Sequence, residues 1–149
     1  MNAVAVSHPP ALRPVGIDHI ALIASDYSRS KTFYTEVLGL AVLHEEYRAE
    51  RQSYKLDLRL PDGTRLELFS FPSPPPRCSF PEACGLRHLA LRVADMAASL
   101  RLLAEHGVVA EPVRTDPITG ALFTFIADPD GLPIELVADA AAGVWPSSA

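Results

Sequence analysis

The sequence predicts an α+β fold built from two tandem modules, each of one strand, one helix and three strands. Three landmarks occur twice in the same order: Gly-x-x-His-x-Ala-Leu at 16–22 and 85–91, an aspartate seven residues after each histidine, and Pro-Asp-Gly shortly before Glu-Leu. His19 and Glu67 are 48 positions apart, and His88 and Glu135 are 47 apart. Landmarks repeated in a fixed order indicate an internal duplication.

Length and composition indicate one domain whose partner is a small molecule. A chain of 149 residues is long enough for one core, which two modules of about 55 residues would share. A net charge of −5 without a Lys/Arg run argues against nucleic acid or an anionic membrane as partner. No apolar run approaches the roughly 20 residues that span a bilayer, and two cysteines suit a reducing cytoplasm.

The first module, residues 16–71, has a local signal for each element. Residues 17–23 alternate as a strand does, with His19 and Leu22 on opposite faces. Ser25 or Asp26 can cap the following helix, and Gly39 can end it in a left-handed conformation. Because Asp-Gly between two apolar runs is typical of a hairpin, the last two strands should be joined at Asp62-Gly63. The later strands are expected at 40–47, 53–60 and 64–71.

The second module, residues 85–138, follows a Pro-rich linker at 72–84. Asp95 should cap its helix and Gly107 should end it. The strands are expected at 86–93, 108–114, 121–127 and 132–137. Residues 1–15 and 139–149 are predicted to form a flexible arm and a flexible tail.

The two His…Glu pairs are the strongest candidates for chemistry. A lone histidine on an apolar strand is usually a core residue, but both modules place histidine on the first strand and glutamate on the last. Glu67 shares its strand face with Phe69 and Phe71, and an aromatic pair favours a covered cavity. Two ionised carboxylates at one partly buried point favour a cation between them. Two nitrogens and two oxygens without thiolate suit nickel, cobalt, manganese, iron or zinc.

This duplicated His…Pro-Asp-Gly…Glu pattern resembles the vicinal oxygen chelate superfamily, and the ligand set resembles that of metal-dependent glyoxalase I. The resemblance covers 16–138, apart from the two tails. It implies a curved mixed sheet around a cavity with one divalent ion per site. The implied ligands are His19, Glu67, His88 and Glu135. Glu135 would double as the base that moves a proton between adjacent carbons, with Glu67 beside it as the second catalytic carboxylate.

The resemblance departs from glyoxalase I where glutathione would bind. Bacterial glyoxalase I has an arginine and an asparagine at the positions of Ile23 and Phe71, so the thiol need not be glutathione. The expected activity is lyase or isomerase chemistry on a small α-oxo or α-hydroxycarbonyl compound. The candidate substrate-binding residues are Phe69, Phe71, Arg48, Arg51, Lys55 and Arg114.

Two alternative functions and the mode of assembly stay open at this point. An extradiol-type dioxygenase would use two histidines and one carboxylate, so the fourth ligand Glu67 counts against it. A bleomycin-resistance type of binding protein would need no metal ligands. A homodimer is expected because open sheet edges benefit from a partner. The modules then pair either within one chain or between two.

Overall fold

The computed structural model describes residues 11–138, and the duplicated order of elements is confirmed there. The first module contains β1 (His19–Ala24), α1 (Tyr27–Thr32), the π-helix η1 (Phe33–Val37), β2 (Ala41–Arg48), the 3₁₀ turn η2 (Ala49–Arg51), β3 (Ser53–Arg59) and β4 (Arg65–Ser70). The second contains β5 (Leu89–Val93), α2 (Met96–Glu105), β6 (Arg114–Thr115), β7 (Leu122–Ala127) and β8 (Pro133–Ala138). Most of the predicted arm and all of the predicted tail lie outside the described residues.

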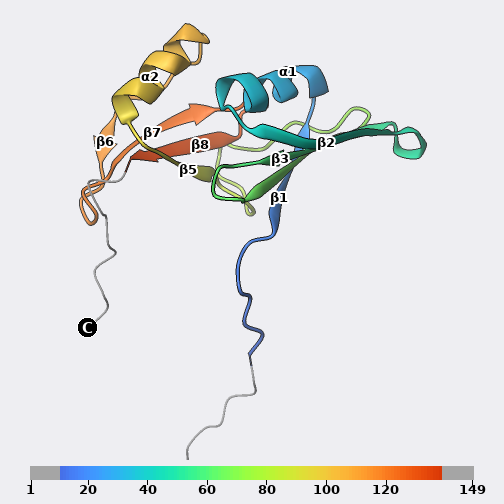
Figure 1. Ribbon diagram of the computed structural model, residues 1–149, viewed down its shortest axis with the longest axis horizontal. Helices are drawn as coiled ribbons and strands as arrows, with labels where there is room; N and C mark the ends of the chain where they lie inside the picture. The colour runs from blue at the N-terminus through green and yellow to red at the C-terminus, as the bar shows by residue number, and fades with distance from the viewer. Residues whose placement is uncertain (1–10, 139–149) are drawn as a thin grey trace, which may run out of the picture.

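Each module forms a four-stranded mixed sheet, and the α+β class is confirmed. The strand orders are β1-β4-β3-β2 and β5-β8-β7-β6. In both sheets the first strand is parallel to the last, and the remaining neighbours are antiparallel. The two sheets lie side by side, with α1 and α2 on the same side of the strands (Figure 1). None of the helices within 11–138 is long and apolar enough to cross a membrane.

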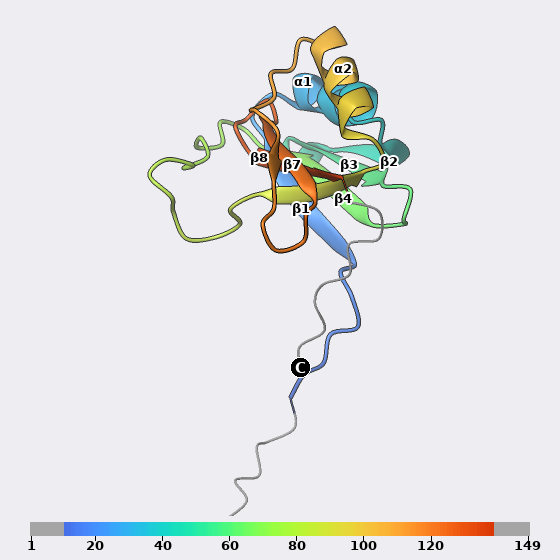
Figure 2. The same cartoon turned by 90° about the vertical axis from the view of Figure 1, so that its left-hand side faces the viewer.

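The two faces of the first sheet differ as the alternation predicts. Leu66 and Leu68 on β4 are almost fully buried beneath the helix layer, together with Leu56 and Leu58 on β3. Glu67 lies between the two buried leucines of its strand and therefore faces the other way. Both helices cover one side of the strands, and no helix formed by residues 11–138 lies over the opposite side (Figure 2).

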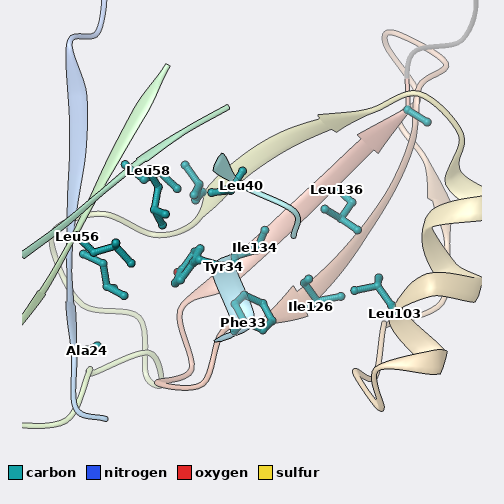
Figure 3. Packing of buried hydrophobic residues seen from close by; sticks show 14 of the residues in the cluster. Ala24, Phe33, Tyr34, Leu40, Leu56, Leu58, Leu103, Ile126, Ile134 and Leu136 are labelled. Carbon is teal, nitrogen blue, oxygen red and sulfur yellow. The ribbon is translucent and has the colours of Figure 1, made fainter. Parts of the chain in front are cut away.

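The helix layer joins the modules into one core. Phe33 and Tyr34 from η1 lie between the leucines of β3 and Ile134 of β8 (Figure 3). The Tyr34 hydroxyl also donates a 2.8 Å hydrogen bond to Asp128, at the end of β7. The expectation that two small modules share one core is confirmed.

Two elements differ in detail from the expectation. The helix caps form, because Asp26 accepts from Arg29 N and Asp95 accepts from Ala98 N. However, the first helix becomes a π-helix after Thr32. The strand expected at 108–114 is reduced to Arg114–Thr115. Pro112 has no N–H to donate to β7, so the regular ladder is interrupted there, although Glu111 N beyond it still donates a 2.9 Å hydrogen bond to Phe125 O.

Candidate metal-binding half-sites

The first His–Glu pair lies on the face of the first sheet that points away from α1 and α2. The parallel register of β1 and β4 sets Ala21 opposite Glu67, and the small alanine leaves the carboxylate room beside the imidazole. His19 Nε2 is 3.7 Å from Glu67 Oε2. His19 Nδ1 lies 2.8 Å from the Asp18 carboxylate, which orients the ring. The hydrogen bonds from His19 and Arg65 hold the pKa of Asp18 below its usual range.

The second pair repeats this arrangement on the second sheet. Ala90 on β5 lies opposite Glu135 on β8, and His88 directly precedes β5. His88 Nε2 is 3.2 Å from Glu135 Oε2. The Phe125 ring meets His88 edge-on, with the ring centroids 5.3 Å apart. His88 Nδ1 is buried and has no hydrogen-bond partner among the described residues.

The two glutamates differ in what lies across the strand from them. Asp57 on β3 is the register partner of Glu67, whereas Phe125 on β7 is the register partner of Glu135. Lys55 Nζ lies 2.7 Å from Asp57 Oδ1 and 3.3 Å from Glu67 Oε1. The hydrogen bond to Asp57 is the main cause that raises the pKa of Lys55. Glu67 is thus held by a cation, whereas Glu135 pairs only with His88 within 11–138.

The pairs do not join into a single cluster within one chain. Among residues 11–138, no group of three or more His, Cys, Asp or Glu side chains lies close enough together to hold a metal ion. His88, Arg114 and Phe125 line a cavity of about 470 Å³ against the Pro-rich linker, and neither His19 nor Glu67 reaches it. Each sheet therefore supplies one nitrogen and one oxygen donor.

Comparison with known proteins identifies the family of this two-module fold. The family model of the Glyoxalase/Bleomycin resistance protein/Dioxygenase superfamily matches residues 16–136. The chain belongs to this superfamily. The resemblance inferred from the duplicated pattern is thereby confirmed at the level of the superfamily.

Three proteins illustrate what the chain is similar to. It is 56% identical over 120 residues to the uncharacterized protein YwkD of Bacillus subtilis, covering 80% of this chain and 94% of YwkD. A glyoxalase family protein from Enterococcus faecalis has 46% identity and a TM-score of 0.76, covering 83% of this chain and 97% of that one. The trypanothione-dependent glyoxalase I of Leishmania major has 29% identity and a TM-score of 0.65, covering 86% and 89%.

The donor atoms of each half-site are of the type that a divalent ion binds, but one half-site alone has too few of them. Members of the glyoxalase superfamily commonly bind a divalent metal. Imidazole nitrogen with carboxylate oxygen is a suitable combination for such ions. In this chain His19 is also oriented by a carboxylate on its other nitrogen, as metal-ligating histidines usually are. Each half-site supplies only two donors, so a second half-site is needed to complete four ligands.

The cationic candidates have different partners. Arg48 stacks over Phe69, with its guanidinium carbon 4.8 Å from the ring centroid. Arg114 stacks over Phe123 at 4.9 Å and is also ion-paired to Glu111 at 2.9 Å. Lys55 is ion-paired to the two acids described above. Arg51 lies exposed in η2, and no partner is found for it in the described part of the chain.

Sequence reasoning missed three residues of these faces. Phe123 and Phe125 line the second half-site beside His88 and Arg114, and their i, i+2 spacing on an expected strand is the signal that could have found them. Asp57 joins the first half-site through Lys55. Its position beside Glu67 depends on the register of β3 and β4, which the sequence does not give directly.

Proposed function

We propose that the protein is a divalent-metal-dependent lyase or isomerase of the glyoxalase I type, assembled as a homodimer. In this proposal His19 and Glu67 of one chain and His88 and Glu135 of a second chain hold one ion, giving one ion per chain. The observation that carries the proposal is the equivalence of the pairs: each places an imidazole Nε2 beside a carboxylate, next to a small alanine. Four such ligands leave an octahedral nickel, cobalt, manganese, iron or zinc ion two positions for substrate.

In this proposal, different residues have different roles in proton transfer on a small α-oxo or α-hydroxycarbonyl compound. When bound, the divalent ion supplies Lewis-acid stabilisation of negative charge on the substrate oxygens. Glu135 takes the proton from one carbon and returns it to the next, because no lysine or arginine within 11–138 is ion-paired to its carboxylate. Glu67 stays in place, since Lys55 binds Oε1 and leaves Oε2 towards His19. Phe69 and Phe71 provide an apolar surface for the substrate body.

The proposed setting is the cytoplasm. Cys78 and Cys84 are exposed and free, and exposed thiols persist in a reducing compartment. The proposed substrate is a small molecule such as a thiol adduct. The Leishmania relative, a trypanothione-dependent glyoxalase I, provides a precedent for a thiol other than glutathione.

The test is metal analysis with substitution of the ligands and the base. The reconstituted protein should hold about one ion per chain, and His88→Ala should remove most of the affinity because it deletes one of four ligands. Chelation should lower the melting temperature, since an ion that binds only the folded state stabilises it. His106→Ala is the control, because His106 is exposed at the end of α2, on the helix side of the strands. Full metal content in both His19→Ala and His88→Ala would contradict the proposal.

The role of the base has its own readout. Glu135→Gln keeps an oxygen at the half-site but removes the proton acceptor. We expect it to lower kcat by about 10²- to 10⁴-fold, the usual contribution of a positioned general base. Metal content, measured in parallel, should change much less. Equal kcat in wild type and Glu135→Gln would reject the assignment.

A further inference from the structure

Arg48 lies on the proposed substrate side of the first half-site. It is the last residue of β2 and the register partner of Ser53, the first residue of β3. Its guanidinium lies over the face of Phe69, and the Phe71 ring centroid is 6.0 Å from the guanidinium carbon. Arg48 Nη2 donates a 2.7 Å hydrogen bond to Oγ of the fully buried Ser53. The cation is therefore fixed on the same sheet face as Glu67.

This cation lacks a carboxylate partner in the part of the chain that the structure describes. No carboxylate among residues 11–138 forms an ion pair with Arg48, and its Nε is buried without a hydrogen-bond partner. Asp57 and Glu67, which share the face, are ion-paired to Lys55 instead. Withdrawing a charge from water without a partner is costly. A guanidinium presents a rigid fork of donors that matches a carboxylate, so the free donors of Arg48 suit an anionic ligand.

Arg114 provides a natural comparison on the second sheet. It stacks over Phe123 and Phe125 much as Arg48 stacks over Phe69 and Phe71. Unlike Arg48, it is neutralised by Glu111 at 2.9 Å. The two half-sites share the stacked arginine but differ in its charge balance. Of these two stacked arginines, Arg48 is the one without a carboxylate partner among residues 11–138.

The spacing along β4 sets the size of the ligand. Phe69, which carries the guanidinium, lies two residues after Glu67, or roughly 7 Å along a strand. We infer that the substrate is a small α-oxo or α-hydroxycarbonyl acid whose reacting end lies at Glu67 and whose distal carboxylate binds Arg48. The Phe69 ring then lies under the chain that links the two ends. This inference rests on the proposed function and names the substrate class of that same site.

The experiment compares 2-oxo diacids of three chain lengths with a 2-oxo acid that lacks the distal carboxylate and matches the longest of them in length. Metal-reconstituted wild type, Arg48→Gln and Arg114→Gln are titrated calorimetrically with 2-oxosuccinate, 2-oxoglutarate and 2-oxoadipate, and with 2-oxohexanoate as the analogue without a distal charge. At least one diacid should bind wild type about tenfold or more tightly than 2-oxohexanoate. This is the gain in affinity expected from one charge-assisted hydrogen bond between Arg48 and the distal carboxylate. That preference should disappear in Arg48→Gln and persist in Arg114→Gln. Arg48→Lys should keep part of it, because the charge remains but the fork is lost.

The results test the role of Arg48 independently of the proposed metal-dependent function. An unchanged preference for diacids in Arg48→Gln, or no preference in wild type, overturns the inference even if the metal binds. The same comparison is made by thermal shift in chelator with millimolar 2-oxoadipate. Suppose that metal analysis finds no bound ion, and that the preference for diacids persists in chelator and depends on Arg48. The Arg48 subsite would then be supported and the proposed function rejected. Arg48→Lys retains the positive charge and is the control for a folding defect in Arg48→Gln.

Discussion

At the scale of single residues, the sequence predicts candidate side chains but not which ones touch. The repeated pattern places histidine on the first strand of each module and glutamate on the last, and the structure adds that the two side chains of each module lie 3.7 Å and 3.2 Å apart. The contact of Lys55 with Glu67 was not predicted, because it depends on the exact register of β3 and β4. Arg48 was a candidate for substrate binding. Its stacking on Phe69, and the lack of an ion-paired carboxylate for it within 11–138, are visible only once the sheet is built.

Tyr34 shows how one residue can connect the two modules. Only 1% of it is exposed, and its hydroxyl donates to Asp128, which also accepts from two backbone N–H groups. Tyr34→Phe leaves the Asp128 carboxylate short of one buried partner. We expect it to lower the free energy of unfolding by about 1–3 kcal/mol in urea denaturation. Tyr47→Phe is the control, since Tyr47 is 54% exposed and no hydrogen bond of its hydroxyl is found within 11–138. Equal losses in both variants would contradict this role.

The same tyrosine gives a pH prediction. Burial, and then the nearby Asp128 charge, raise the pKa of Tyr34 far above the ordinary 10.0. A group whose pKa is higher in the folded state than in the unfolded state contributes its full stabilisation below the unfolded-state pKa. This stabilisation is lost as the pH rises from the unfolded-state pKa towards the folded-state pKa. Stability should therefore fall above about pH 10, and part of that fall should be absent in Tyr34→Phe. Chemical denaturation between pH 8 and pH 11 measures it. Identical slopes in wild type and Tyr34→Phe would contradict the prediction.

Ile23 and Phe71 predict poor use of glutathione. They occupy the places where polar groups would bind the tripeptide's carboxylate, and Ile23 is 58% exposed on the site face. Arg48, beside Phe71, can bind only one of the two glutathione carboxylates. One missing charge-assisted contact of about 1.5–3 kcal/mol lowers kcat/KM by roughly one to two decades. The assay is turnover of the methylglyoxal–glutathione hemithioacetal with each metal. A kcat/KM near the diffusional range would be incompatible with this prediction.

At the scale of elements, the caps and turns were predictable and the irregular segments were not. Asp26 and Asp95 cap their helices, and Gly39 and Gly107 adopt positive φ values of 69° and 70° at the helix ends. The π-helix η1 has no local signal, since Phe33 and Tyr34 gain their positions from packing on the second module. The short β6 could have been foreseen, because Pro112 interrupts the expected strand.

The cap of α2 gives a direct test at this scale. Asp95 Oδ1 accepts a 2.9 Å hydrogen bond from Ala98 N and satisfies one of the free N–H groups of the first turn. Asp95→Ala should lower the free energy of unfolding by about 0.5–2 kcal/mol in urea, whereas Asp95→Ser should lose much less. Both substitutions remove the charge, so only the capping bond separates them. Equal losses of unfolding free energy in the two variants would show that the capping hydrogen bond contributes little to stability.

At the scale of the whole molecule, duplication and small module size correctly predict two similar units with one core. The arrangement of the His–Glu pairs does not follow from the pattern, because it depends on how the units meet. The helix layer joins the modules through Phe33, Tyr34 and Ile134. The pairs lie on two separate sheets and do not form a cluster of three donors within 11–138. This separation is why the proposed metal site requires a second chain.

The most direct test of that central proposal mixes two damaged chains. His19→Ala and His88→Ala proteins, each carrying a different affinity tag, are unfolded, refolded together and purified through both tags. If the ion lies between chains, the heterodimer contains one intact site and one doubly damaged site. We therefore expect about one tightly bound ion per heterodimer, and activity, while either variant alone shows little of both. A verified heterodimer that binds no more metal than its two parents would contradict the account.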